Sequence, residues 1–196
     1  MVEVHILSGG VDSTSVLHRR LAETENIVHV LHLRGTSDGA IAHTLAARQI
    51  VVWLAKNVRT FTYREVMGIQ MVGKACGNIL FAQCGFMLGE YIVRNPDIAA
   101  VVQGSNGDAA DQSEDSLFRN RYREGVCAAV CNGYAPAPEW LYPNSDLTKL
   151  EAFRRLPPEL RELCWTCFTP SRQGEAYVPC GTCEKCKELL AVKEAE

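Results

Sequence analysis

Apolar and polar positions alternate in short runs along the first third of the chain. Apolar residues at positions 2, 4 and 6 are separated by polar ones, which predicts a strand over residues 1–7. Residues 14–22 space their apolar positions at helical intervals, and residues 27–33 form a second, strongly apolar strand. A helical pattern over 40–56 and a plausible strand over 58–63 follow. The order β-α-β-α-β predicts a parallel sheet with helices on both faces.

Elements of the same two kinds continue towards residue 156. They are a helix over 78–93, a strand over 98–103, a helix from near Ser116 towards Cys131, a short strand over 139–142 and a helix at 146–151. Pro157 and Pro158 then mark a boundary. We predict a doubly wound, parallel-sheet α/β domain over residues 1–156, with ligands beyond the carboxyl ends of its strands, and a small module over 157–196.

Composition and charge narrow the classes of function. The net charge is -3 with no basic block, so we expect no direct nucleic-acid binding, and a free base or nucleotide suits the chain better. No apolar run of about 18 residues and no signal-peptide pattern occurs, so we expect a cytoplasmic protein that does not bind membranes. Nine cysteines in such a protein favour metal binding or reactive thiols over disulfides.

The most informative stretch is the loop Ser-Gly-Gly-Val-Asp-Ser-Thr at residues 8–14, between the first strand and the first helix. Gly9 and Gly10 let the main chain approach a ligand closely, and free N–H groups at the helix start point at negative charge. Three hydroxyls, from Ser8, Ser13 and Thr14, add donors, and Val11 lies among them. Asp12 is expected to cap the helix or to meet a magnesium ion that bridges phosphates.

This loop lacks the spacing of a Walker A or Gly-x-Gly-x-x-Gly motif, but it resembles the Ser-Gly-Gly-x-Asp-Ser pyrophosphate loop of the ATP pyrophosphatase (PP-loop) superfamily. The resemblance implies an adenine nucleotide alpha hydrolase-like, Rossmann-like domain that holds the pyrophosphate of ATP while a substrate is adenylated. Leu33 and the residues just after it are then placed to meet the adenine or ribose. His32, within the same strand, is more often a structural residue.

A second polar stretch, residues 104–115, follows the strand at 98–103. Gly104 opens the loop, and carboxylates at Asp108, Asp111, Glu114 and Asp115 suit an amino-pyrimidine ring or magnesium. We prefer Asp111 and Asp115 as substrate contacts; the alternative is a solvated acidic loop that caps the next helix. The arginines at 119, 121 and 123 are expected on a solvated face, and Lys149 is able to reach a phosphate or carboxylate.

Five cysteines lie in the last 33 residues, as Cys164-x-x-Cys167 and Cys180-x-x-Cys183-x-x-Cys186. Four thiolates at such spacing are typical of a closed, structural zinc site. Spacing alone favours Cys164 with Cys167 plus one later pair, and an iron–sulfur cluster is the alternative to zinc.

Together, the loop and the cysteines resemble the 7-cyano-7-deazaguanine synthases, a queuosine-pathway branch of the same superfamily. Cys164-Trp-Thr-Cys167-Phe and Cys180-Gly-Thr-Cys183-Glu-Lys-Cys186 match the family's two cysteine elements. The resemblance implies zinc ligands at Cys167, Cys180, Cys183 and Cys186, leaves Cys164 spare, and matches Lys149 to a family lysine. It fails at residues 32–38 and 110–115, where the family's pocket-shaping segments are replaced, so the chain resembles a short, divergent member.

The resemblance implies ATP-dependent adenylation of 7-carboxy-7-deazaguanine and its conversion with ammonia to the nitrile, with magnesium, structural zinc and a homodimer. Asp12, Ser13 and Lys149 would be the catalytic residues. Three alternatives remain: the enzyme stops at the amide or uses another amine, in nucleic-acid modification or defence; it thiolates tRNA, which needs a catalytic cysteine near the loops; or it binds nucleotide without turnover.

Overall fold

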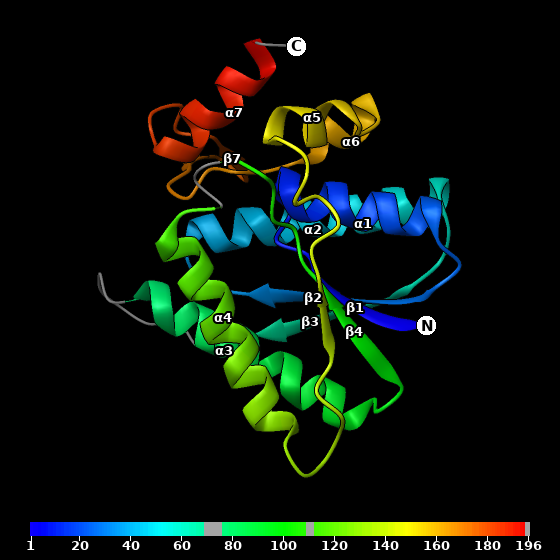
Figure 1. The fold of residues 1–196 in the computed structure, drawn as a ribbon. Coiled ribbons are helices and arrows are strands. Elements are labelled where there is room, and N and C mark those ends of the chain that lie inside the picture. The colour runs from blue at the N-terminus through cyan, green and yellow to red at the C-terminus, as the bar shows by residue number, and fades with distance from the viewer. Residues whose placement is uncertain (69–75, 109–111, 195–196) are drawn as a thin grey trace.

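The computed structural model describes residues 1–68, 76–108 and 112–194, with the backbone alone at 76–80. Its centre is a five-stranded sheet in the order β3-β2-β1-β4-β5, in which every neighbouring pair is parallel (Figure 1). The strands are β1 (Val2–Ile6), β2 (Ile27–Arg34), β3 (Thr62–Met67), β4 (Ile98–Val102) and β5 (Glu139–Leu141). The predicted doubly wound α/β class is confirmed, and the strand order reverses between β1 and β4.

Helices cover both faces of this sheet (Figure 1). On one face, α1 (Val11–Glu23) and α2 (Asp38–Asn57) pack against β2 through a cluster that includes Leu17, Ile50 and Val30. On the other, α3 (Cys76–Arg94) and α4 (Glu114–Cys131) pack through a second cluster that includes Leu88, Cys127 and Val101. Burial on both faces is what a parallel sheet requires.

The central strand β1 buries its polar positions as well as its apolar ones. The side chains of Glu3 and His5 are 0% and 2% exposed. Glu3 accepts hydrogen bonds from Arg20 at 2.6 and 3.1 Å and from Asn26 at 2.8 Å, and its Oε1 lies 2.9 Å from His5 Nε2. Because these partners compensate the buried carboxylate, a polar position is tolerated inside the sheet.

The third strand lies four residues later than predicted. Residues 58–61 were expected to begin it, but Val58 is the C-cap of α2, and Val58 and Phe61 pack against the first core cluster from a connection. Arg59 fixes that connection by donating to the carbonyls of residues 21, 24 and 26. Two partly buried apolar residues in a connection therefore resembled the start of a strand.

The C-terminal part adds α5 (Lys149–Arg154), α6 (Pro158–Leu163), the antiparallel pair β6 (Ser171–Gln173) and β7 (Ala176–Val178), and α7 (Glu184–Glu194). Leu160 and Cys164 belong to the same core cluster as Leu17 of α1. The division into domains at residues 156 and 157 stays a prediction. None of the described helices has the length and apolar character needed to span a membrane.

Candidate functional site

The glycine-rich loop connects the end of β1 to α1, at the carboxyl edge of the sheet. Gly9 has a φ of +85°, a conformation that favours glycine, and a Cβ there would lie 2.8 Å from the carbonyl oxygen of His43 on α2. His43 also bonds the loop, since its Nδ1 lies 3.1 Å from the carbonyl oxygen of Ser8. No local sequence pattern predicted this contact, which fixes the loop against α2.

The loop hydroxyls divide into two groups. The Oγ atoms of Ser8 and Ser13 lie 2.9 Å apart at the exposed side of the loop, where they can meet a ligand. The hydroxyl of Thr14 instead donates to the carbonyl of Gly10 at 2.7 Å, and Thr14 is fully buried, as is Val11. The N–H of Thr14 also donates to the carbonyl of Gly10, at 3.1 Å, so the predicted contribution of these two residues to ATP binding falls to the main chain of Val11.

Asp12 does not cap α1, which corrects one of its two expected roles. The N-cap is Gly10, without a side-chain hydrogen bond. The Asp12 carboxylate accepts a hydrogen bond from Asn106 Nδ2 at 2.7 Å and lies 3.3 Å from Lys149 Nζ. Its expected role towards magnesium stays a prediction.

Lys149 lies at this loop although it follows it by more than 130 residues. Its Nζ is 3.3 Å from Asp12 and 2.7 Å from Glu188 of α7, and the side chain is 12% exposed. Burial alone would lower the pKa of Lys149, but the two carboxylates outweigh it and raise that pKa, so the ammonium stays charged. A fixed cation beside a loop whose sequence predicts anion binding is suited to neutralising phosphate charge.

The acidic stretch contributes less directly than expected. Asp108 accepts a hydrogen bond from the backbone N–H of Lys149 at 2.7 Å, so its carboxylate positions the start of α5. Asp115 lies in the first turn of α4, is 66% exposed and pairs with Arg119 at 2.5 Å. Ser113, not an acidic residue, caps α4 by accepting from the N–H of Ser116. Asp111 lies outside the described residues.

Gly104 contacts the glycine-rich loop, residues 8–14, through its backbone. A Cβ at this position would lie 2.6 Å from the backbone nitrogen of Ser13 and 2.7 Å from the carbonyl carbon of Asp12. Glycine is therefore needed for the end of β4 to approach the loop. Leu33 is partly buried near the end of β2, and its predicted contact with adenine stays a prediction. His32 is structural as expected, since Leu7 and Thr44 bond its two ring nitrogens.

A cavity of about 230 Å³ opens beside Ser8 and Ser13 at the carboxyl ends of β1 and β4. This is the crevice where the strand order reverses, the usual ligand position in such sheets. Its lining residues are Ile6, Ser8, Ser13, Phe81, Gln103, Gly104, Ser105, Ser116, Arg119, Asn120 and Arg123.

The α4 side of this cavity is the main part of the site that was not predicted from the sequence. Arg123 was expected on a solvated face, yet it is 5% exposed and donates to the side-chain oxygens of Gln103 and Asn120. Arg121 is exposed as expected, whereas Arg119 is partly buried and lines the cavity. The spacing of Arg119 and Arg123 by four residues was the available signal, because it places both on one helix face.

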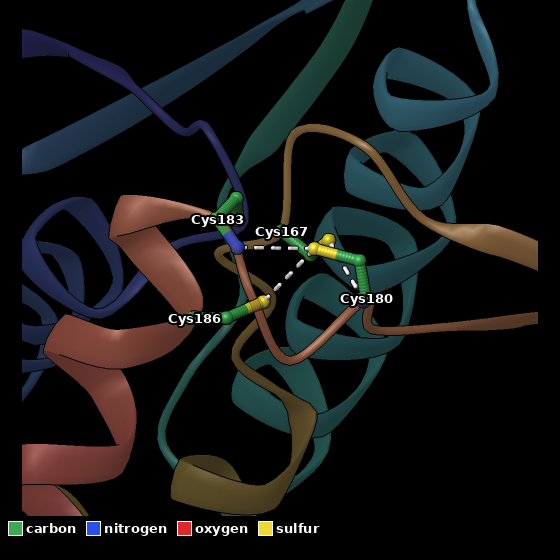
Figure 2. Close-up of side chains that lie close together, drawn as sticks. All are labelled: Cys167, Cys180, Cys183 and Cys186. Atoms are coloured by element: carbon green, nitrogen blue, oxygen red, sulfur yellow. Dashed lines mark hydrogen bonds between the residues drawn. The ribbon is translucent and has the colours of Figure 1, made fainter.

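Four cysteines meet at the start of α7 (Figure 2). The Sγ atoms of Cys167, Cys180, Cys183 and Cys186 all lie within 4.8 Å of one another, and those of Cys180 and Cys186 are 3.9 Å apart. The N–H of Cys180 donates to the sulfur of Cys167, and the N–H of Cys183 to that of Cys180, both at 3.3 Å. This four-cysteine cluster is able to hold a metal.

Cys164 is not part of the four-cysteine cluster. It packs in the first core cluster, its Sγ lies 3.4 Å from the carbonyl oxygen of Leu160, and burial raises its pKa to about 12. The structure therefore groups the set implied by the resemblance rather than the set favoured by spacing alone. Cys127 and Cys131 are likewise buried, and burial raises both pKa values, so neither is an activated thiol.

The cysteine segment contacts the glycine-rich loop directly. The N–H of Trp165 donates to the carbonyl of Gly9 at 2.8 Å, and Glu188, two residues after Cys186, holds Lys149. At Gly39 on α2, an added Cβ would lie 2.3 Å from the carbonyl oxygen of Phe168. The segment that carries the four-cysteine cluster therefore contacts the glycine-rich loop, α2 and α5, and helps to fix the position of the loop.

Comparison with known proteins identifies similar folds. No protein-family model and no curated protein sequence matches this chain. Among solved structures, the U34-tRNA thiolase NcsA from Methanococcus maripaludis, determined with its [4Fe-4S] cluster, matches with a TM-score of 0.56 and 13% identity, over 100% of this chain and 65% of NcsA. A predicted subunit of tRNA methyltransferase from Methanocaldococcus jannaschii matches with a TM-score of 0.37 and 12% identity, over 99% of this chain and 89% of that one. The second value is too low to establish a shared fold. The first shows that this chain, which spans about two thirds of the length of NcsA, has the same fold.

Proposed function

We propose that this protein is an ATP-dependent ligase that adenylates a small heterocyclic carboxylic acid, 7-carboxy-7-deazaguanine, and passes the activated acid to ammonia. The observation that carries the proposal is the ammonium of Lys149, which lies 3.3 Å from Asp12 in a loop of anion-binding sequence. Two segments far apart in sequence, both implied by the family resemblance, meet at the carboxyl edge of the sheet. That position is where ligands of such sheets bind.

The chemistry requires charge neutralisation more than a nucleophilic side chain. The carboxylate oxygen of the acid attacks the α-phosphorus of ATP, the bond from that phosphorus to the bridging oxygen breaks, and pyrophosphate leaves. Ammonia then attacks the acyl carbon, AMP leaves, and loss of a proton gives the amide. A second adenylation, at the amide oxygen, followed by loss of AMP and a proton, gives the nitrile.

The residues of the chain supply binding and position. The hydroxyls of Ser8 and Ser13 and the N–H groups at the start of α1 would hold the phosphates, and Lys149 would neutralise the leaving pyrophosphate. Asp12 would hold a magnesium ion, which would neutralise negative charge on the phosphates. Catalysis then depends on positioning and electrostatics.

We assign zinc to the four-cysteine cluster. Zn–S bonds of about 2.3 Å at tetrahedral angles place sulfurs roughly 3.8 Å apart. Sulfurs within 4.8 Å of one another fit a single ion of this kind, whereas a four-iron cluster would separate them further. Four thiolates leave no open position, so the ion would be structural.

Mass spectrometry of products tests the proposal, after incubation of the zinc-loaded protein with ATP, magnesium, 7-carboxy-7-deazaguanine and ammonium, with AMP followed in parallel. A nitrile with AMP supports the complete reaction, and an amide supports a version that stops after one adenylation. AMP with the acid joined to another amine supports the transfer alternative. No AMP with any acid would make this a nucleotide-binding protein without turnover and would contradict the proposal.

A second candidate, ATP-dependent tRNA thiolation, is favoured by the fold that this chain shares with NcsA. It would require the four cysteines to move apart and hold an iron–sulfur cluster in place of zinc. Elemental analysis and absorbance of protein purified without oxygen separate the two: zinc without visible absorbance favours the ligase, and about four irons per chain with cluster absorbance favours the thiolase. A homodimer and a cytoplasmic location remain proposals.

A further inference from the structure

The cavity beside the phosphate loop has a positive wall. Arg119 and Arg123 both line it, and none of its described lining residues carries a carboxylate. The Arg123 guanidinium lies over the rings of Phe81 and Trp140, at 5.3 and 5.6 Å from their centroids, and Arg119 lies 5.8 Å from the Phe81 centroid. The cavity therefore favours an anion.

Both arginines have an unused donor. The Nε atoms of Arg119 and Arg123 are buried and have no hydrogen-bond partner within the described part of the chain. A buried unsatisfied N–H costs about 1–3 kcal/mol, so such groups are expected to serve a ligand. Arg123 is more than nine-tenths buried, and its Nη2 is already fixed by the neutral amides of Gln103 and Asn120, which makes it a rigid part of the wall.

Asp115 explains how Arg119 is oriented. The exposed carboxylate of Asp115 forms an ion pair with Arg119, and its oxygen lies 2.5 Å from Arg119 Nη2. Asp115 does not line the cavity, so it acts through Arg119 and is a positioning residue. Asp115, which was predicted to contact the substrate, thus orients Arg119 instead.

Size and position narrow the ligand. A cavity of about 230 Å³ is smaller than the roughly 300–1,000 Å³ of typical ligand sites, so it suits one small molecule rather than a whole nucleotide. Ser8 and Ser13 belong to both the cavity and the loop, so a molecule in the cavity lies against phosphates held by the loop. A carboxylate brought towards a phosphate needs a cation to offset their repulsion.

We infer that this cavity binds the carboxylic acid substrate, and that Arg119 and Arg123 bind its carboxylate. The inference rests on the proposed function and deepens it: the substrate class is a small aromatic or heterocyclic acid of one or two rings. Guanidinium groups match carboxylate geometry and bind it through charge-assisted hydrogen bonds. Phosphate is the other anion that this pair of arginines would fit, and the test separates the two.

Calorimetry on the full chain measures binding of two acids, 7-carboxy-7-deazaguanine and indole-3-carboxylate, and of two phosphate probes, pyrophosphate and α,β-methylene-ATP. R119Q should weaken binding of at least one acid ~10-fold or more, the range of a charged hydrogen bond, and leave the phosphate probes within about 2-fold. R119K should recover part of the loss. R121Q removes an exposed arginine from the same helix and should leave both kinds of probe within about 2-fold of wild type.

The uncharged carboxamide of the best acid supplies a second measurement. It should bind the wild type ~10-fold more weakly than the acid, and R119Q should weaken it no further, because the charge that Arg119 recognises is already gone. Unchanged acid affinity in R119Q, a loss confined to the phosphate probes, or no acid binding at millimolar concentration would each overturn the inference. Thermal unfolding confirms that R119Q is folded.

The outcomes separate this inference from the proposed function. AMP formation by the wild type, with an acid affinity that R119Q does not change, would leave the proposed function standing and reject the acid site. Acid binding that depends on Arg119, without AMP formation under any condition, would support the acid site and reject the proposed function.

Discussion

Replacement of Lys149 by methionine tests the charge that the site is built around. Methionine keeps most of the buried stem and removes the ammonium that lies between Asp12 and Glu188. Two unit charges about 4 Å apart interact by ~4 kcal/mol at an effective dielectric constant of 20. Water and magnesium recover part of this, so we expect a loss of about 3 kcal/mol of transition-state stabilisation, or ~100-fold in kcat/KM.

Pyrophosphate release, followed at varied ATP and saturating acid, is the assay. K149R should retain more activity than K149M because it keeps the charge. K193M is the matched control: Lys193 lies on α7 as Glu188 does, pairs with Glu162 at 3.3 Å and is 38% exposed, so its loss should change activity less than about 2-fold. Activity of folded K149M within about 3-fold of wild type would refute the role of Lys149.

Three further predictions concern the loop, the central strand and the cysteines. G104A forces a Cβ to within 2.6 Å of the Ser13 nitrogen and should lower affinity for α,β-methylene-ATP ~10-fold or more. At Gly125 an added Cβ meets nothing within 4 Å, so G125A should stabilise α4 by about 0.5–1 kcal/mol. Equal behaviour of the two variants in calorimetry and thermal unfolding would contradict this prediction. Burial alone would raise the pKa of Glu3, but hydrogen bonds from His5 and Arg20 lower that pKa from 4.5 to about 2. Ionised Glu3 therefore stabilises the fold by roughly 3 kcal/mol above pH 4.5, and this stabilisation is lost as the pH falls through 2. The difference in free energy of unfolding between wild type and E3Q, from urea titrations at pH 7 and pH 2.5, should therefore shrink at the lower pH, and a constant difference would be inconsistent with the ion pair. C180S should lose most bound zinc and C164S should keep about one ion per chain, and elemental analysis that shows the reverse would exchange the roles of the two cysteines.

The sheet was predictable because its strands are short apolar runs with helical patterns between them. Strand β3 was misplaced because Val58 and Phe61 pack against the core from a connection while only partly buried, and hydrophobic periodicity does not distinguish this from a strand. The polar positions of β1 were equally ambiguous. Glu3 is fully buried only because Arg20 and Asn26 reach it from other elements.

The glycine-rich loop was predicted from local sequence to bind phosphate, but the roles of its partners depend on tertiary contacts. Asp12 contacts Asn106 and Lys149, which are about a hundred residues away or more, so no local pattern separates that arrangement from a helix cap. Asp108 and Asp115 carry the charge that a ligand site needs, yet their carboxylates meet a backbone N–H and an arginine. The acidic stretch was therefore a poor guide to the substrate.

The burial of the cavity arginines and the identity of the clustered cysteines also depend on tertiary packing, which local sequence does not reveal. Arg123 is buried because Phe81 and Trp140, on separate elements, enclose it. Cys164 and Cys167 have ideal ligand spacing, but the turn after α6 directs Cys164 into the core. Composition and spacing identified the kind of site, and packing decided its members.

Acid-dependent exchange of labelled pyrophosphate into ATP is the decisive measurement, because it reports the reversible adenylation step without requiring ammonia. We expect label to enter ATP only when 7-carboxy-7-deazaguanine or another small acid and magnesium are present, and we expect K149M to abolish most of this exchange. Exchange that requires tRNA in place of a small acid, or no exchange with any acid although the protein binds ATP, would contradict adenylation of a small acid by this protein.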